Sequence, residues 1–161
     1  MTETLTKNSQ IVQETLDKHG LQYKVAELPS STRTALDAAN SIGCDISQIV
    51  KSLIFKTTKT NRPVLVLASG PNRVDEKKLK LHIAEEIAKA DADFTKEITG
   101  FTIGGIPPIG HKNAIDLIFI DKSLLQYNEV WAAAGTSHSV FSINPHDLCY
   151  ISNGKIIDIK S

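Results

Sequence analysis

Two short apolar runs on either side of a polar turn constrain the fold of this chain more than any other feature. Leu53-Ile54-Phe55 and Val64-Leu65-Val66-Leu67 consist of branched and aromatic side chains, and Lys59-Thr60-Asn61-Arg62 separates them. Runs of this length and composition are typical of β-strands, and short polar stretches between them are typical of turns. The sequence therefore predicts two strands joined by a polar turn.

The segments around these strands change between helical and strand patterns without a regular repeat. Helices are expected at residues 8–19, from 35 to about 43, at 75–90 in one or two segments, and at 95–98, with single turns at 45–50 and 144–148. Thr32 or Thr34 would cap the second helix, because a threonine hydroxyl accepts a hydrogen bond from a free helix amide. Further strands are expected at residues 23–28, 101–103, 115–120, 130–134, 140–143 and 156–159. This order predicts an α+β fold with a mixed or antiparallel sheet and packed helices.

Length and composition are those of an ordinary globular protein. The 161 residues suit one domain with one core, so residues 1–161 are expected to form a single domain. Apolar residues make up 41% of the chain, and the longest apolar stretch, at 64–68, is too short to cross a bilayer. Residues 1–4 do not begin a basic and apolar leader, so we expect no signal peptide and a cytoplasmic protein.

Charge limits the kind of partner that the chain can bind. Lys plus Arg is 18 and Asp plus Glu is 18, so the net charge is zero. A protein that follows a long stretch of nucleic acid usually carries a basic stripe. The dense basic cluster, Lys77, Lys78 and Lys80, is flanked by acidic residues and is typical of a solvated helix face. We therefore expect neither DNA nor a membrane as a partner, and any other nucleic acid would be gripped over a small part only.

Familiar catalytic motifs are missing from the sequence. It contains no GxxxxGK[ST], GxGxxG, HExxH or GxSxG pattern. The 5 histidines, at positions 19, 82, 111, 138 and 146, have no metal-ligand spacing, and Cys44 and Cys149 are too few for a disulfide framework. No metal ion or cofactor is expected.

A loop rich in glycine and proline is the first of three segments that could carry chemistry. It reads Gly104-Gly105-Ile106-Pro107-Pro108-Ile109-Gly110. Glycines let a backbone approach a ligand closely, and two prolines form a stiff wall. Beyond the prolines, the amides of Gly110 and His111 are free to point at a ligand oxygen. A tight connection between two strands is the simpler interpretation, and composition alone favours it.

Lys51 is the second candidate, because it lies where a polar segment enters the apolar strand at 53–55. A partly buried ammonium binds anions strongly and shifts its pKa. The alternative is a lysine at a strand edge whose charged end reaches solvent, which is the commoner case.

The third candidate segment is Gly135-Thr136-Ser137-His138-Ser139, which follows the strand expected at 130–134. Its hydroxyls and histidine could form a polar pocket floor or a turn with local hydrogen bonds. Ser137 and His138 are not expected to act as nucleophile and base, because neighbouring residues on a strand point to opposite faces.

Taken in order, these segments resemble the YbaK/ProX family, which includes the editing domain of bacterial prolyl-tRNA synthetases. The matching stretches are residues 32–35 (TRTA), 48–55 (QIVKSLIF), 102–110 (TIGGIPPIG), 134–136 (AGT) and 143–148 (INPHDL). The resemblance spans most of the chain and raises the lysine and the loop above their simpler interpretations. It implies an α+β domain with a mixed, barrel-like sheet and peripheral helices. It also implies hydrolysis of the ester between a wrong amino acid and the terminal adenosine of tRNA.

The same resemblance assigns the site residues. The lysine matching Lys51 is essential in the family, and the loop shapes the amino-acid pocket. Lys51 would bind the substrate electrostatically, and amides near Gly105 and Gly110 would stabilise the oxyanion. The expected binding residues are Thr34, Gly104, Ile106, Pro107, Pro108, Gly135, Thr136, Ser137 and His138.

A wall made by Pro107 and Pro108 would exclude bulky side chains, so the substrate is expected to carry alanine, serine, cysteine or threonine. A synthetase is a possible further partner. Two alternatives stay open: an inactive adaptor of the same fold that binds tRNA or a synthetase, and a lysine that forms a Schiff base with a carbonyl substrate.

Overall fold

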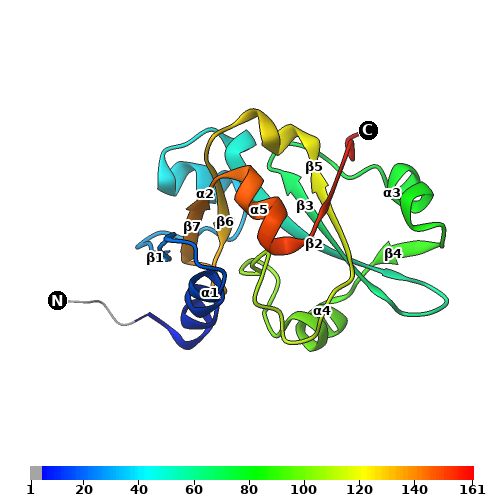
Figure 1. Ribbon diagram of the computed structural model, residues 1–161, viewed down its shortest axis with the longest axis horizontal. Coiled ribbons are helices and arrows are strands. Elements are labelled where there is room, and N and C mark those ends of the chain that lie inside the picture. Colours follow the sequence, from blue (N-terminus) through cyan, green and yellow to red (C-terminus); the bar gives the residue numbers. More distant parts are fainter. Residues whose placement is uncertain (1–4) are drawn as a thin grey trace.

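A computed structural model describes residues 5–161 and contains one mixed, 8-stranded sheet with helices around it (Figure 1). The strands are β1 (Ala26–Glu27), β2 (Ile49–Thr57), β3 (Pro63–Ser69), β4 (Ile87–Lys89), β5 (Leu117–Asp121), β6 (Val130–Ala133), β7 (Ser139–Ile143) and β8 (Lys155–Ile157). Their order in the sheet is β1-β7-β6-β2-β3-β5-β8, and β4 pairs with β2 beside this path. The helices are α1 (Lys7–Lys18), α2 (Ala35–Ile42), α3 (Glu76–Ile83), α4 (Ala92–Thr99) and α5 (Pro145–Ser152), with 3-10 turns η1 (Ile46–Gln48) and η2 (Lys122–Gln126).

The predicted strand pair lies at the centre of the sheet. β2 and β3 are antiparallel, with Val50 opposite Ser69 and Lys56 opposite Pro63. Val64 to Ala68 are all fully buried, because side chains from both faces of β3 enter hydrophobic clusters. A strand buried on both faces reads as a continuous apolar run, which is why the sequence located it so clearly.

The second edge of β2 is shared between two strands. β6 pairs with it in parallel at Ile49 and Val50, and β4 pairs with it antiparallel from Phe55 to Thr57. Within the described part of the chain, residues 51–54 therefore have no strand partner along this edge. The gap opens the sheet beside Lys51.

Two element predictions are wrong. The segment 75–90, expected to be helical, is α3 followed by β4, because Ala84 takes a left-handed conformation (φ +63°) and ends the helix. The following residues pair with the edge of β2, and this tertiary contact overrides their helical propensity. Residues 101–103 are a turn rather than a strand, and the Thr99 hydroxyl accepts a hydrogen bond from the amide of Phe101 at 3.0 Å.

The α+β class with a mixed sheet and peripheral helices is confirmed. Thr34 caps α2 by accepting a hydrogen bond from the amide of Asp37 at 3.0 Å, and Gly43 ends that helix with φ +84°. α1 and β1 lie at one end of the molecule and α3 and β4 at the other (Figure 1). No helix in the described range is long and apolar enough to cross a membrane. The expectation about a signal peptide depends on residues 1–4, which lie outside that range.

Candidate active site

A cavity of about 750 Å³ opens at the gap in the β2 edge. Its walls come from the start of α2, from β2, from the segment after β3 and from the loop after α4. Of the predicted site residues, four line it: Thr34, Lys51, Gly104 and Ile106. The structure thus brings together side chains that are up to 72 positions apart in the sequence, from Thr34 to Ile106.

Lys51 is half-buried in the cavity wall and is held by one strong hydrogen bond. Its Nζ donates to the backbone carbonyl oxygen of Asn72 at 2.6 Å. Burial lowers the pKa of Lys51, Asp121 raises it, and the charges of Arg73 and Lys89 lower it. The lysine is therefore fixed in the site rather than extended into solvent as the simpler interpretation has it.

Positive charge gathers around the cavity although the whole chain is neutral. Arg33, Lys51, Arg73 and Lys89 line it, and the one carboxylate among the described lining residues is Glu76. Arg33, Arg73 and Lys89 are exposed, and they form no ion pair with any residue in the 5–161 range. Such a rim attracts an anionic ligand.

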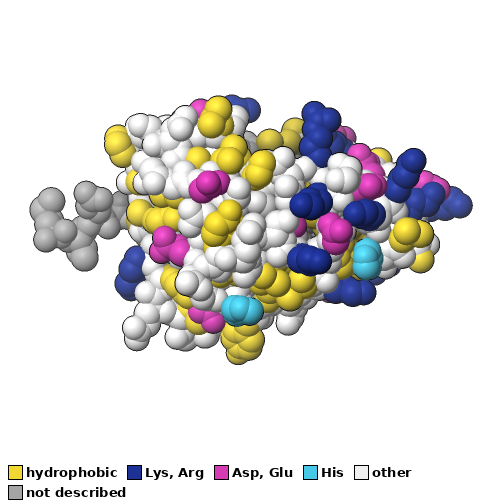
Figure 2. Space-filling model, turned by 90° about the horizontal axis from the view of Figure 1, so that it is seen from above, with side chains coloured by type: hydrophobic (Ala, Val, Ile, Leu, Met, Phe, Trp, Pro, Cys, Tyr) yellow, Lys and Arg dark blue, Asp and Glu magenta, His cyan; other side chains and the backbone are white. Residues whose placement is uncertain are grey.

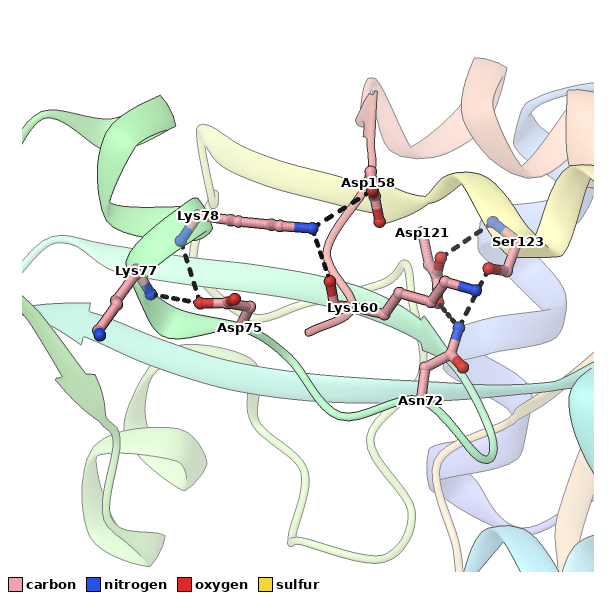
Figure 3. Close-up of polar contacts among 8 residues, drawn as sticks. All are labelled: Asn72, Asp75, Lys77, Lys78, Asp121, Ser123, Asp158 and Lys160. Carbon is pink, nitrogen blue, oxygen red and sulfur yellow. Dashed lines mark hydrogen bonds and ion pairs between the residues drawn. The ribbon is translucent and has the colours of Figure 1, made fainter.

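The basic cluster noted in the sequence behaves differently. Lys78 pairs with Asp158 at 3.3 Å, and Lys80 pairs with Glu86 (Figure 3 shows the Lys78 contacts). In Figure 2, Lys and Arg side chains near the α3 end alternate with Asp and Glu. This cluster is a solvated, paired helix face, as predicted.

The paired glycines of the loop serve close packing. A Cβ on Gly105 would lie 2.8 Å from the carbonyl carbon of Thr136, and a Cβ on Gly104 would lie 2.7 Å from Cγ of Arg33. The Gly105 amide donates to the carbonyl oxygen of Thr102 at 3.1 Å, and the Gly105 carbonyl accepts from Gly135 at 2.9 Å. The Gly105 amide is thus engaged within the loop, against the expectation that it binds an oxyanion.

The remainder of the loop lies behind the cavity. Pro107 and Pro108 are buried and do not line it, so the wall expected from the prolines is formed by Ile106 instead. Gly110 (φ +83°) packs on α1, where a Cβ would lie 3.2 Å from the Thr15 hydroxyl. His111 Nε2 contacts the carbonyl oxygen of Pro107 at 2.7 Å, and burial lowers the pKa of His111 although this hydrogen bond raises it.

Residues 135–138 lie in the turn between β6 and β7, Ser139 begins β7, and none of the five lines the cavity. The hydroxyls of this segment are used locally: Thr136 Oγ1 and Ser139 Oγ are 2.7 Å apart, and the Ser137 carbonyl accepts from the amide of Thr32 at 2.6 Å. Ser137 Oγ and His138 Nδ1 are 3.1 Å apart, because the two residues lie in a turn rather than on opposite faces of a strand. Of the two interpretations in the sequence, the structure favours the turn.

Comparison with known proteins decides the family. The sequence-family model for the aminoacyl-tRNA editing domain matches residues 29–150, about three quarters of the chain. The chain belongs to this family. The resemblance inferred from the sequence is therefore confirmed, and membership supports the predicted aminoacyl-tRNA deacylase activity.

Relatives of this editing domain include small proteins and parts of large enzymes. The uncharacterized protein YwhH of Bacillus subtilis (strain 168) is 30% identical over 84% of this chain and 85% of its own length. The proline–tRNA ligase of Thermoanaerobacter sp. (strain X514) is also 30% identical, over 85% of this chain but only 23% of the ligase. A crystal structure described as a candidate trans-editing enzyme for prolyl-tRNA synthetase has a TM-score of 0.91 and 39% identity, covering 98% of this chain and 99% of that one.

Sequence reasoning missed several residues of the editing-domain cavity. Arg33, Asn72, Arg73 and Lys89 come from turns and edges, where no local pattern reveals that they converge. Ser52 was also missed: it lines the cavity, and its Oγ is a buried side-chain oxygen without a hydrogen-bond partner within the described residues. An unsatisfied buried hydroxyl is rare, but only a structure can reveal it.

Proposed function

We propose that this editing domain is a hydrolase that acts in trans on mischarged tRNA and removes a small amino acid such as alanine, serine, cysteine or threonine. The observation that carries the proposal is the cavity of about 750 Å³ beside Lys51, whose wall carries four cationic side chains and one carboxylate. A cavity of this size suits a small ligand. The likeness to the candidate trans-editing enzyme supports action in trans on a tRNA, and membership of the editing-domain family, whose substrates belong to translation, supports a cytoplasmic place of action.

The cationic rim supports binding of the acceptor end in particular. Arg33, Arg73 and Lys89 are exposed and surround the cavity that Lys51 lines. Phosphates of the last nucleotides would lie against this rim while the aminoacyl ester enters the cavity. Because only a few phosphates are neutralised, a chain with zero net charge suffices.

The chemistry is hydrolysis of an ester. A water oxygen attacks the carbonyl carbon, the bond to the ribose oxygen breaks, and that oxygen takes up a proton, which leaves a free amino acid and a free tRNA. Lys51 holds the terminal phosphate or the ester carbonyl as an ammonium and is not the nucleophile. No histidine or cysteine lines the cavity in the described range, and its one carboxylate, Glu76, is exposed. We therefore assign the orientation of the water to a ribose hydroxyl of the substrate or to a backbone carbonyl.

The backbone of Ser52 is a better candidate for the oxyanion donor than the loop amides. The carbonyl of Ile49 bonds toward β3, through Gly70, and the carbonyl of Ile54 bonds toward β4, through Ala90. Since alternate residues of a strand direct their backbone groups to opposite edges, the amide of Ser52 faces the gap between β6 and β4. A backbone amide aimed into a cavity stabilises developing negative charge.

Selectivity for small side chains is assigned to Ile106, which lines the cavity and is 7% exposed. Ile106→Ala enlarges the cavity and is expected to admit bulkier amino acids. The matched variant Pro108→Ala changes a residue behind the wall and leaves the substrate profile unchanged. The profile is measured as deacylation rates for a panel of tRNAs charged with amino acids of increasing size. Equal profiles for wild type and Ile106→Ala would refute this assignment.

The proposal itself is tested by the same panel with the wild-type protein. Release of small amino acids, above the spontaneous hydrolysis measured without protein, is the expected result. The alternative is an adaptor that binds tRNA or a synthetase. Retention of mischarged tRNA on the protein without any release would favour the adaptor and refute the hydrolase.

A further inference from the structure

A buried carboxylate behind the cavity is connected to Lys51 through one asparagine. Asp121, the last residue of β5, is 1% exposed and is absent from the cavity lining. We propose that Asp121 is a positioning residue for the hydrolysis, which holds Lys51 in place through Asn72. This inference rests on the role proposed above for Lys51.

Asn72 contacts Lys51 through its backbone carbonyl and Asp121 through its side chain. Its backbone carbonyl accepts the hydrogen bond from Lys51 Nζ at 2.6 Å. Its side-chain Nδ2 donates to Asp121 Oδ2 at 2.9 Å and to Ser123 Oγ at 3.1 Å (Figure 3). The side-chain bonds fix the orientation of the peptide whose carbonyl meets the lysine.

The position of Asp121 requires a carboxylate. Its Oδ2 accepts from the amide of Ser69 at 3.0 Å as well as from Asn72, and its Oδ1 accepts from the amide of Ser123 at 2.9 Å. All of these partners are N–H donors, so an ionised carboxylate, which only accepts, satisfies them together. An amide at this position would place its NH₂ group, a donor, against one of these N–H donors, and that hydrogen bond would be lost.

The same geometry gives Asp121 an electrostatic effect on the lysine. Its negative charge raises the pKa of Lys51 against the larger effect of burial, and so supports the ammonium form. The other charged groups around Lys51 come from four segments. They are Arg33 before α2, Arg73 after β3, Glu76 on α3 and Lys89 on β4. Among the causes that shift the pKa of Lys51, Asp121 is the one that stabilises the charged form.

A purely structural role is the competing explanation, because Asp121 also caps η2. Asp45 offers a matched control: it caps η1 in the same way, accepting from the amide two residues ahead at 2.9 Å, and it is exposed. Asn is as good a cap as Asp, so Asp45→Asn keeps its cap. Asp121→Asn keeps the bond from the Ser123 amide that caps η2, but its amide nitrogen then faces the donors of Ser69 and Asn72. Only Asp121→Asn removes a charge near Lys51.

Two readouts test the inference. The first is kcat/KM for a tRNA charged with alanine as a function of pH, corrected for spontaneous hydrolysis. The second is the titration of the Lys51 side chain, followed by its ¹³Cε resonance in protein labelled on lysine and assigned by its absence in Lys51→Arg. For Asp121→Asn we expect kcat/KM to fall by about tenfold to a hundredfold, the order seen when a catalytic group is misplaced by about 1 Å. We also expect both the alkaline loss of activity and the Lys51 titration to move to lower pH.

The outcomes separate this inference from the proposed function. If Asp121→Asn leaves the Lys51 titration where it is in wild type and in Asp45→Asn, the inference is overturned, whatever happens to activity. If wild type releases no amino acid, the proposed function fails, while the titration still tests Asp121. Should Asp121→Asn not fold, Asn72→Ala serves instead: the inference expects about a tenfold fall in kcat/KM, and unchanged kcat/KM overturns it.

Discussion

Gly105→Ala is the substitution for which the structure gives the sharpest expectation. The new Cβ would lie 2.8, 2.9 and 3.0 Å from the carbonyl carbon, Cα and amide nitrogen of Thr136, all of them backbone atoms. Contacts below 3.0 Å do not persist, so the two backbones must separate by about 0.6 Å to reach an ordinary contact distance of 3.4 Å. The hydrogen bond from Gly135 to the Gly105 carbonyl, now 2.9 Å, would then stretch toward the limit of a useful bond.

The size of the effect follows from this overpacking. Adding a methyl group to a tightly packed region typically costs about 1–3 kcal/mol, and for a chain of this length that corresponds to a fall in Tm of roughly 2–12 °C. Gly105 lies between Gly104 and Ile106, which line the cavity. A displacement of this order should therefore also reduce kcat/KM, by about tenfold.

Thermal unfolding and deacylation of an alanyl-tRNA measure the two effects on the same preparations. Gly20→Ala is the control, because a Cβ at Gly20 has nothing within 4 Å and only its positive φ of +73° makes it costly. It should lower the Tm through backbone strain of about 1–2 kcal/mol and leave kcat/KM unchanged. Wild-type Tm and kcat/KM in Gly105→Ala would refute the close-packing role of this glycine.

Three further substitutions test separate parts of the account. Ser52→Ala removes a buried hydroxyl that has no partner in the described structure. Urea denaturation should therefore give a free energy of unfolding higher than that of wild type by about 1 kcal/mol, and a lower value would show that the hydroxyl has a partner. Burial lowers the pKa of His111, so its neutral form stabilises the fold above the ordinary value of 6.5 and this contribution is lost as pH falls below it. His111→Gln should thus lose less Tm between about pH 7 and pH 5 than wild type. Equal losses would contradict a lowered pKa of His111. Arg73→Gln should raise KM and reduce the salt dependence of KM by about one unit of slope, whereas an unchanged slope would exclude Arg73 from phosphate binding.

The sequence was sufficient where local chemistry determines structure. β3 is predictable because both of its faces are buried and apolar, β2 because it contains the apolar run 53–55, and α2 because Thr34 and Gly43 supply its caps. β4 was not predictable, since its residues continue a helix-forming stretch and become a strand only because the edge of β2 lacks a partner there.

The residues of the candidate site likewise fall into those whose role the sequence reveals and those whose role depends on distant contacts. Lys51 was identified from its place at the start of an apolar strand, strengthened by the family resemblance, and it does line the cavity. Glycine identity, however, does not tell whether the missing Cβ makes room for a ligand or for another backbone: Gly105 accommodates Thr136 and Gly110 accommodates α1. Asp121 left no signal in the sequence, because its role depends on Asn72, which lies 49 positions away.

The most direct test of the account is a single-turnover comparison of wild type and Lys51→Ala on the mischarged tRNA that wild type hydrolyses fastest. Lys51 contributes a fixed charge in the cavity wall, so its removal should slow deacylation by at least about a hundredfold. Because Lys51 is only half-buried, the Tm should stay close to that of wild type. Near-normal deacylation by a folded Lys51→Ala protein would contradict the assignment of this cavity as the active site.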